Sequence, residues 1–251
     1  MFNIYVDGFS QLLNNVKCDC SINEVSINHL IYADDTVLIA PSARGLQQLI
    51  LLCEQYANKT DIMFNVKKSV YMCIMPKSKF ISNVPRVYLN GRKIDLVDKY
   101  KYLGMIICDV NKDDEAIASQ IRGLYSRGNV IIKNFSNCTE EVKCLLFKAF
   151  CCNFYCCHLW SNCTKESRRR LKVAHNRVFR NLMKLRGRTS MSQSFMKYNV
   201  SHSDVIIRKS ILGFMKRITS SNNDLVCTLV NSNHYFNSSL FKYWAFNLFS
   251  K

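Results

Sequence analysis

Two adjacent aspartates, Asp34 and Asp35, stand between the β-prone runs His29–Tyr32 and Thr36–Ala40. Apolar runs on both sides of a polar pair predict a β-hairpin with the acids at its turn. Carboxylate oxygens suit Mg²⁺, which proteins commonly hold with one or two carboxylates and substrate phosphates. Side chains alternate along a strand, so we expect one of the two to be the main ligand. The pair could support metal-assisted nucleotidyl transfer if a neighbouring strand adds a carboxylate; an ordinary hairpin turn is the alternative.

The second feature that could do chemistry is a run of basic residues. Net charge is +17, and residues 116–251 hold 22 basic and only 5 acidic side chains. Between Lys165 and Arg188 the one acid is Glu166, and apolar residues recur there at helical spacing at Leu171, Ala174, Val178, Leu182 and Leu185. A helix docked by that stripe would turn its arginines outward, and arginine suits bidentate phosphate contacts. The predicted nucleic-acid-binding residues are Arg168, Arg169, Arg170, Lys172, Arg177, Arg180, Lys184, Arg186 and Arg188.

Thirteen cysteines are an odd number in a long chain without a secretory signal pattern, so we expect no disulfide partner. The densest group, Cys151, Cys152, Cys156 and Cys157, has no second cysteine pair at zinc-finger spacing. It lies in the apolar run Phe147–Trp160, which favours small buried thiols on a core helix. A cysteine-rich metal protein remains the alternative.

Composition excludes several classes of protein. Hydrophobic residues make up 48% and charged residues 21% of the chain, which excludes a wholly disordered protein. The uncharged stretch Ala149–Thr164 is shorter than the roughly 20 apolar residues of a membrane span. We expect an intracellular protein of the nucleus or cytoplasm with no membrane partner.

The elements that must position these residues divide into two parts. Up to about residue 112 the pattern is α+β, and after it the chain reads as helices. We expect domains at 1–112, 113–190 and 191–251. The expected elements are a helix from the first residue, the 29–40 hairpin, a helix at 45–58, a strand region at 62–74, an Asn-Gly hairpin at 87–94, a strand at 100–107, and helices at 116–134, 139–160, 165–186 (with Gly187 as its stop) and 203–219.

Several of these motifs together resemble reverse transcriptases, especially those of non-LTR, LINE-type retrotransposons. Tyr32-Ala-Asp-Asp35 between apolar strands is similar to their catalytic hairpin, and Phe2–Tyr5 is similar to the helix that follows their template-contacting motif. Asn65, Lys68 and Ser69 match their Asn-x-x-Lys-Ser/Thr motif, and Tyr102-Leu103-Gly104 matches their primer-grip hairpin. Asn176–Arg180 and Phe214–Arg217 resemble pieces downstream of the thumb in jockey- and CR1-like elements.

The resemblance implies a partial polymerase palm, an antiparallel sheet with helices, followed by an all-helical basic thumb-like region. It implies RNA-directed DNA polymerase activity on an RNA template, a DNA primer and deoxynucleoside triphosphates. Asp34 and Asp35 would then be catalytic Mg²⁺ ligands, Tyr32 and Lys68 would lie near the nucleotide, and Tyr102, Leu103 and Gly104 would hold the primer.

The resemblance also implies that a first catalytic Asp and the fingers precede Met1, because no other residue here stands in for that Asp. We therefore expect a fragment that does not polymerise DNA alone. The alternative is a non-catalytic RNA- or DNA-binding module, whose affinity would fall steeply with salt and would not depend on Asp34.

Overall fold

The computed structural model describes residues 2–16, 20–23, 25–74 and 83–249. They form two compact units, Met1–Lys99 with Asp224–Ser232, and Tyr100–Asn223 with Asn233–Lys251. The α+β class is confirmed. The boundary between the units lies before Tyr100, so the 100–107 segment belongs with the helices rather than with residues 1–99. None of the described helices is both long and apolar enough to cross a membrane.

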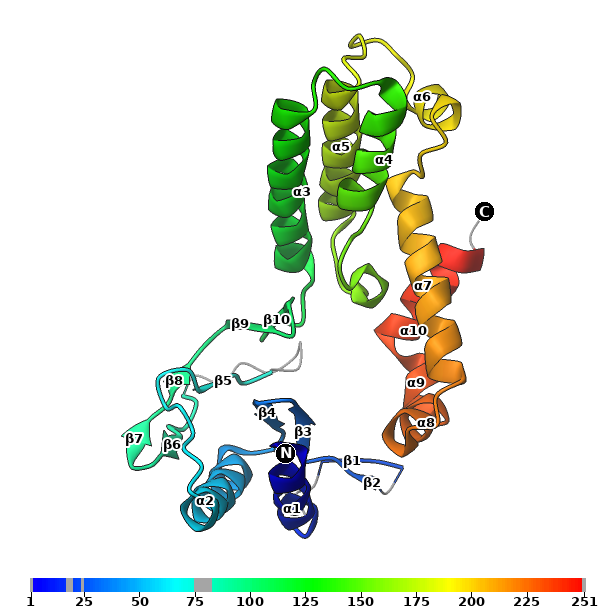
Figure 1. The fold of residues 1–251 in the computed structure, drawn as a ribbon. Helices are drawn as coiled ribbons and strands as arrows, with labels where there is room; N and C mark the ends of the chain where they lie inside the picture. The colour runs from blue at the N-terminus through cyan, green and yellow to red at the C-terminus, as the bar shows by residue number, and fades with distance from the viewer. Residues whose placement is uncertain (1, 17–19, 24, 75–82, 250–251) are drawn as a thin grey trace. The chain divides into compact units, whose positions relative to one another are not determined.

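The first unit contains helices and short strands (Figure 1). Its elements are α1 (Phe2–Asn14), β1 (Ser21–Ile22), β2 (Val25–Ser26), β3 (His29–Tyr32), β4 (Asp35–Leu38), α2 (Ala43–Thr60), β5 (Val70–Tyr71), β6 (Tyr88–Leu89), β7 (Arg92–Lys93), β8 (Asp95–Leu96) and α8 (Asp224–Val230). Within the described residues the strands pair two by two, and the β5–β8 pair is parallel. The sequence predicted an antiparallel sheet; these short pairs instead form separate ladders.

Two small cores hold the first unit together. Phe9 and Leu13 of α1 pack with Leu49 and Cys53 of α2, on positions that recur at helical spacing. The neighbouring residue Ile50 of α2 belongs to a second core, with residues of the strands β5 and β6 and of the segments that flank them. The helix begins at its capping residue Ser42, whose hydroxyl accepts the Gly45 N–H. The predicted helices at the chain start and at 45–58 are confirmed, although Met1 lies outside the described residues.

The second unit is mainly helical. Its elements are β9 (Lys99–Tyr102), whose first residue belongs to the first unit, β10 (Met105–Cys108), α3 (Asp114–Asn134), α4 (Glu140–Cys151), the 3₁₀ helix η1 (Cys157–Leu159), α5 (Lys165–Leu182), α6 (Met191–Lys197), α7 (Ser203–Thr219), α9 (Asn233–Asn237) and α10 (Ser239–Phe249). Helices α3, α4 and α5 lie side by side in Figure 1 and are in mutual contact. Both tryptophans of the chain, Trp160 and Trp244, are buried in this unit.

Close packing of α3 on α5 depends on a glycine. A Cβ added to Gly128 of α3 would lie 2.4 Å from Cγ1 of Val178, so the two helices approach closely only because that Cβ is missing. The starts of the same helices are also joined, because Asp114 accepts hydrogen bonds from the Thr164 N–H (3.0 Å) and hydroxyl (2.6 Å). The unit therefore presents α5 in a fixed orientation on α3.

The predicted helix 139–160 is wrong after Cys151. Helix α4 ends there, Cys156 adopts a positive φ of 54°, and a 3₁₀ turn follows. The Tyr155 N–H points to Gln120 Oε1 of α3, at 3.4 Å, instead of to a carbonyl of α4. The run 147–160 is mostly apolar, so its periodicity did not indicate the break.

The predicted strand region at 62–74 is also largely wrong, because only Val70–Tyr71 is a strand. The predicted helix at 203–219 is confirmed with both bounds, and the 87–94 hairpin has Asn90 and Gly91 at positive φ, as its turn type requires.

Candidate functional site

The aspartate hairpin has the geometry that the sequence predicts. Strands β3 and β4 are antiparallel, with Tyr32 opposite Asp35, so Ala33 and Asp34 form a two-residue turn. Asp34, Asp35 and Tyr32 are exposed, and Tyr32 retains 64% of its accessible surface. Ala33 has a φ of 52°, a conformation that costs an alanine about 1 kcal/mol. The carboxylates are thus presented at the tip of a hairpin whose turn has a strained backbone.

Two polar residues anchor the base of this hairpin. Asn28 is 2% exposed, and its side-chain amide donates to the carbonyls of Leu13 at 2.6 Å and Val16 at 3.0 Å. His29 joins the same network, with Nδ1 2.7 Å from the Asn28 Oδ1 and Nε2 2.8 Å from the Ser10 hydroxyl. Burial lowers the pKa of His29, which keeps the ring neutral. The hairpin is therefore fastened to α1, and the sequence pattern did not predict this because Asn28 and His29 bond to residues more than ten positions earlier in the chain.

The carboxylate pair fits Mg²⁺ in donor type but does not make a complete two-metal site. Carboxylate oxygens are the hard ligands that Mg²⁺ takes. Across the described residues, however, no three His, Cys, Asp or Glu side chains are grouped so that they could hold a metal ion. Asp34 and Asp35 therefore provide part of a site, and another carboxylate must complete it for two-metal chemistry.

The Asn-x-x-Lys-Ser motif forms a turn. The side-chain oxygen of Asn65 accepts a hydrogen bond from the Lys68 N–H at 3.2 Å. The backbone carbonyl of Asn65 accepts two more, from the Ser69 N–H at 3.0 Å and from the Ser69 hydroxyl at 2.9 Å. Asparagine and serine close the turn on each other, as such side chains do. Lys68 is left exposed. This turn replaces the predicted strand and explains why the spacing of Asn65 and Ser69 matters.

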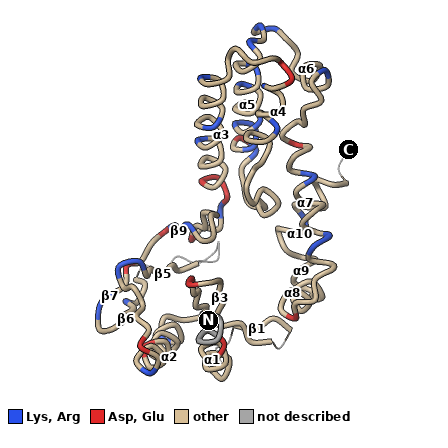
Figure 2. Tube along the Cα trace, in the orientation of Figure 1, with Lys and Arg blue, Asp and Glu red and all other residues tan. Residues whose placement is uncertain are grey.

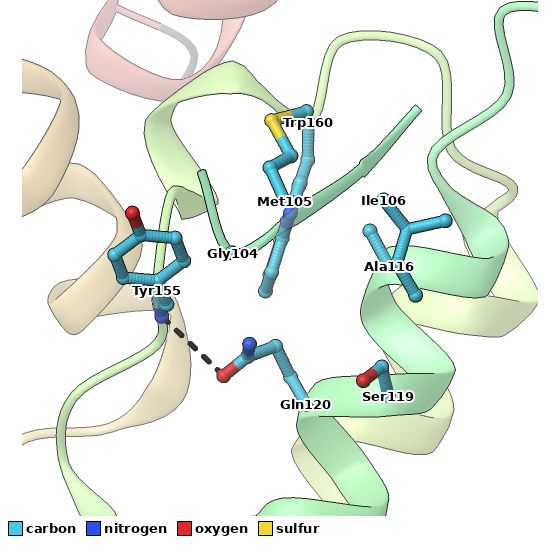
Figure 3. A pocket seen from close by; sticks show the side chains of 8 residues that line it. All are labelled: Gly104, Met105, Ile106, Ala116, Ser119, Gln120, Tyr155 and Trp160. Carbon is cyan, nitrogen blue, oxygen red and sulfur yellow. Dashed lines mark hydrogen bonds between the residues drawn. The ribbon is translucent and has the colours of Figure 1, made fainter. Parts of the chain in front are cut away.

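Tyr102, Leu103 and Gly104 lie at a hairpin turn, whereas the residue pattern alone predicted a strand with an internal glycine. Leu103 and Gly104 both have positive φ, 45° and 83°, as a two-residue type I′ turn requires. Figure 3 shows this turn beside Tyr155, and the space lined by Gly104, Gln120 and Tyr155 has a volume of only about 10 Å³, room for one water. The turn is packed against the helices of its own unit rather than lining a ligand cavity.

Most of the basic residues around α5 fall into two groups. Figure 2 shows Lys and Arg along α5 and its loop to α6. Several of them interact within the fold. Arg168 lies over the Tyr243 ring at 4.9 Å and donates to Asn247 at 3.0 Å, Arg169 pairs with Glu166 at 2.7 Å, and Lys172 pairs with Asp204 at 3.5 Å. The other group is exposed and forms no salt bridge within the described part of the chain; it includes Arg170, Arg177, Lys184, Arg186 and Arg188.

Arg180 belongs to neither group, because it shapes the loop that follows α5. Its guanidinium donates to the carbonyls of Gly187 and, at 3.2 Å, Thr189. The helix ends at Leu182, earlier than predicted, and Lys184 has a φ of 52°. The Leu185 N–H donates to the Arg180 carbonyl, and the Lys184 N–H donates to the Asn181 carbonyl. Lys184 therefore occupies the left-handed position after the helix end that glycine usually takes. The predicted stop at Gly187 is therefore wrong. We name the exposed segment Lys184–Arg188 the basic loop.

Residues 1–107 match the reverse transcriptase (RNA-dependent DNA polymerase) family model. Searches of curated proteins and of solved structures found no match. The reverse transcriptase match spans the aspartate hairpin, the Asn65 turn and the β9–β10 turn, and it ends before α3. It supports a reverse transcriptase-like polymerase, whose substrates in general are a nucleic-acid template and primer together with nucleotides.

Two of the four cysteines near the centre of the chain are buried in the core, as the sequence indicated, and Cys152 and Cys156 are partly buried. Cys151 and Cys157 are 0% exposed, and burial raises the pKa of the Cys151 thiol to about 11 and that of Cys152 to about 12. Burial therefore favours the neutral thiol over the thiolate in both residues. His175 is 0% exposed, with Nε2 3.7 Å from the Cys152 sulfur and no described partner for Nδ1. Burial lowers its pKa to about 4.

Proposed function

We propose that the chain is the palm and thumb portion of an RNA-directed DNA polymerase of the non-LTR, LINE-type retrotransposon class. The observation that carries the proposal is the family match over residues 1–107, with the aspartate pair exposed at a strained hairpin tip inside it. Residues 1–112 would form the palm, 113–190 a thumb-like region and 191–251 a tail. The partners would be an RNA template, a DNA primer and deoxynucleoside triphosphates.

In this proposal Asp34 and Asp35 hold Mg²⁺ together with substrate phosphates, and Tyr32 and Lys68 lie near the nucleotide. Bound Mg²⁺ would neutralise charge on the phosphates during transfer to the primer 3′-OH. The side chains of this chain have simpler tasks. The strained turn at Ala33 presents the carboxylates, Asn28 and His29 keep the hairpin on α1, and Tyr102, Leu103 and Gly104 hold the primer. The basic residues around α5, above all those of the basic loop, would bind the phosphate backbone of the nucleic acid.

The isolated chain is proposed to be inactive in DNA synthesis, because the described residues supply two adjacent carboxylates and no third metal ligand beside them. Primer extension on an RNA template by the purified chain, lost in Asp34→Asn, would overturn this part of the proposal while supporting the role of Asp34.

The test of the metal role is the effect of Mg²⁺ on binding of a primer–template with the next complementary deoxynucleotide. Without metal, the two negatively charged carboxylates repel the phosphates of the substrate. A Mg²⁺ ion bound to the carboxylates would attract those phosphates instead. Wild type is therefore expected to gain affinity on addition of Mg²⁺, and the double variant Asp34→Asn/Asp35→Asn is expected to lose that gain. Asp61→Asn is the matched control, because Asp61 is exposed and has a φ of 54°, which asparagine tolerates well.

A second candidate function, a non-catalytic RNA- or DNA-binding module, is favoured by the exposed basic side chains that lie outside the matched segment. It predicts the same salt-dependent affinity for wild type, Asp34→Asn/Asp35→Asn and Asp61→Asn, with no gain from Mg²⁺ in any of them. The two candidates therefore separate in one binding experiment.

A further inference from the structure

The β9–β10 turn has a backbone that its own sequence does not favour. Leu103 has a φ of 45°, and a left-handed conformation brings the Cβ of an ordinary residue close to a carbonyl oxygen. The Leu103 carbonyl also lies between the ends of β9 and β10 rather than in either strand. A contact from outside the hairpin is therefore well placed to hold this conformation.

Tyr155 makes that contact with both turn residues. Its hydroxyl donates to the Leu103 carbonyl at 2.6 Å, and a Cβ on Gly104 would come within 3.0 Å of the Tyr155 ring. Figure 3 shows the ring beside Gly104, with Gln120 reaching the Tyr155 backbone from α3. The tyrosine thus bonds one turn residue and packs on the other.

Tyr155 is itself fixed in place. The residue before it, Phe154, is 3% exposed, and Cys157 two positions later is 0% exposed, so the segment is held in the core on both sides. The Tyr155 N–H donates to Gln120 Oε1 at 3.4 Å. The Tyr155 side chain, by contrast, lies at the surface, with the residue 49% exposed. A side chain anchored at its backbone and exposed at its tip can transmit the orientation of the helices to a surface turn.

We infer that Tyr155 is a positioning residue that sets the conformation of the Tyr102–Gly104 turn for contact with a primer strand. The inference rests on the proposed function for the primer contact. The hydrogen bond and the ring contact hold Leu103 in its left-handed conformation, so the turn is already in its binding shape before the nucleic acid arrives, and this lowers the cost of binding. Tyr155 links that surface to α3 through Gln120.

The test uses Tyr155→Phe, which keeps the ring and removes the hydroxyl bond. Tyr198→Phe is the matched control, because it removes a hydroxyl that donates to Glu140 at 3.0 Å in the same unit and far along the sequence from the hairpin. Two quantities are measured on the full chain. One is amide hydrogen exchange in Tyr102–Met105. The other is the ratio of affinities for an RNA–DNA hybrid with a recessed primer 3′ end and for the same hybrid with blunt ends.

Loss of one hydrogen bond is expected to speed exchange in the turn by about two- to tenfold, and to lower the preference for the recessed end by a similar factor, with blunt-end affinity unchanged. Tyr198→Phe is expected to change neither. Unchanged exchange in Tyr155→Phe would overturn the inference, and so would faster exchange with an intact end preference, which shows a structural role alone. If wild type binds hybrids without preferring a recessed end, the primer role of the hairpin fails and the inference fails with it. If it binds no nucleic acid at all, the proposed function fails as a whole.

Discussion

Neutralising the basic loop is expected to change how binding depends on salt. Arg186 and Arg188 are exposed and form no ion pair within the described residues, so both are available to phosphates. Each phosphate contact adds about 0.9 to the slope of log affinity against log salt for duplex DNA and about 0.7 for a single strand. Arg186→Gln/Arg188→Gln should therefore flatten the slope by about 1.4 to 1.8. Between about 50 and 200 mM salt, its affinity should fall about 7- to 12-fold less than that of wild type.

The matched control is Arg122→Gln/Lys197→Gln, which removes the same charge from side chains that already face acids. Arg122 lies 3.2 Å from Glu115, and Lys197 lies 4.0 Å from Glu140. The assay is fluorescence anisotropy of a labelled primer–template over a salt series, read as a slope. If the salt slope flattens equally in both double variants, only the net charge of the protein matters. If the slope is unchanged in Arg186→Gln/Arg188→Gln, the basic loop does not contact the phosphate backbone of the nucleic acid. Either result would refute the reasoning.

Two further predictions concern the second unit, and tryptophan fluorescence during urea unfolding measures both, because both tryptophans lie in that unit. The folded-state pKa of His175 is about 4 and its ordinary value is 6.5, so protonation opposes folding as pH falls through that window. Between about pH 7 and 4.5, the free energy of unfolding should fall by about 2 kcal/mol more in wild type than in His175→Phe. Equal losses in the two proteins would contradict this prediction. Gly128→Ala should lower the unfolding free energy by about 1–2 kcal/mol, because overpacking on Val178 exceeds the gain in helix propensity. Gly213→Ala, whose Cβ has room, should raise it.

The sequence predicted elements best where one local pattern determined them. The helix at 203–219 has a regular apolar face, and the hairpins at 29–40 and 87–94 have polar or Asn-Gly turns between β-prone runs. Prediction from the sequence failed where side chains from elsewhere in the unit determined the conformation of the backbone. Helix α4 ends at Cys151 and the segment after it bonds to α3 through Gln120, and no pattern within residues 147–160 shows that partner.

The candidate site shows the same division. Residue type and spacing revealed part of the chemistry: Asp34 lies in the predicted turn, and Asp35 begins the strand that follows it. Contacts between distant segments were not accessible, and these include the anchoring of Asn28 on α1, the Tyr155 bond to Leu103 and the division of the arginines into paired and exposed groups. A left-handed lysine at the end of α5 also replaced the glycine that sequence rules favour.

The aspartate pair is tested most directly by the ratio of primer–template affinities with and without Mg²⁺, in the presence of the next complementary deoxynucleotide. A chain whose hairpin tip holds metal against phosphate should show a ratio above one in wild type and Asp61→Asn, and a clearly lower ratio in Asp34→Asn/Asp35→Asn. The same ratio in all three proteins would contradict a metal-binding role for the hairpin and leave the chain as a module that binds nucleic acid through its basic helices.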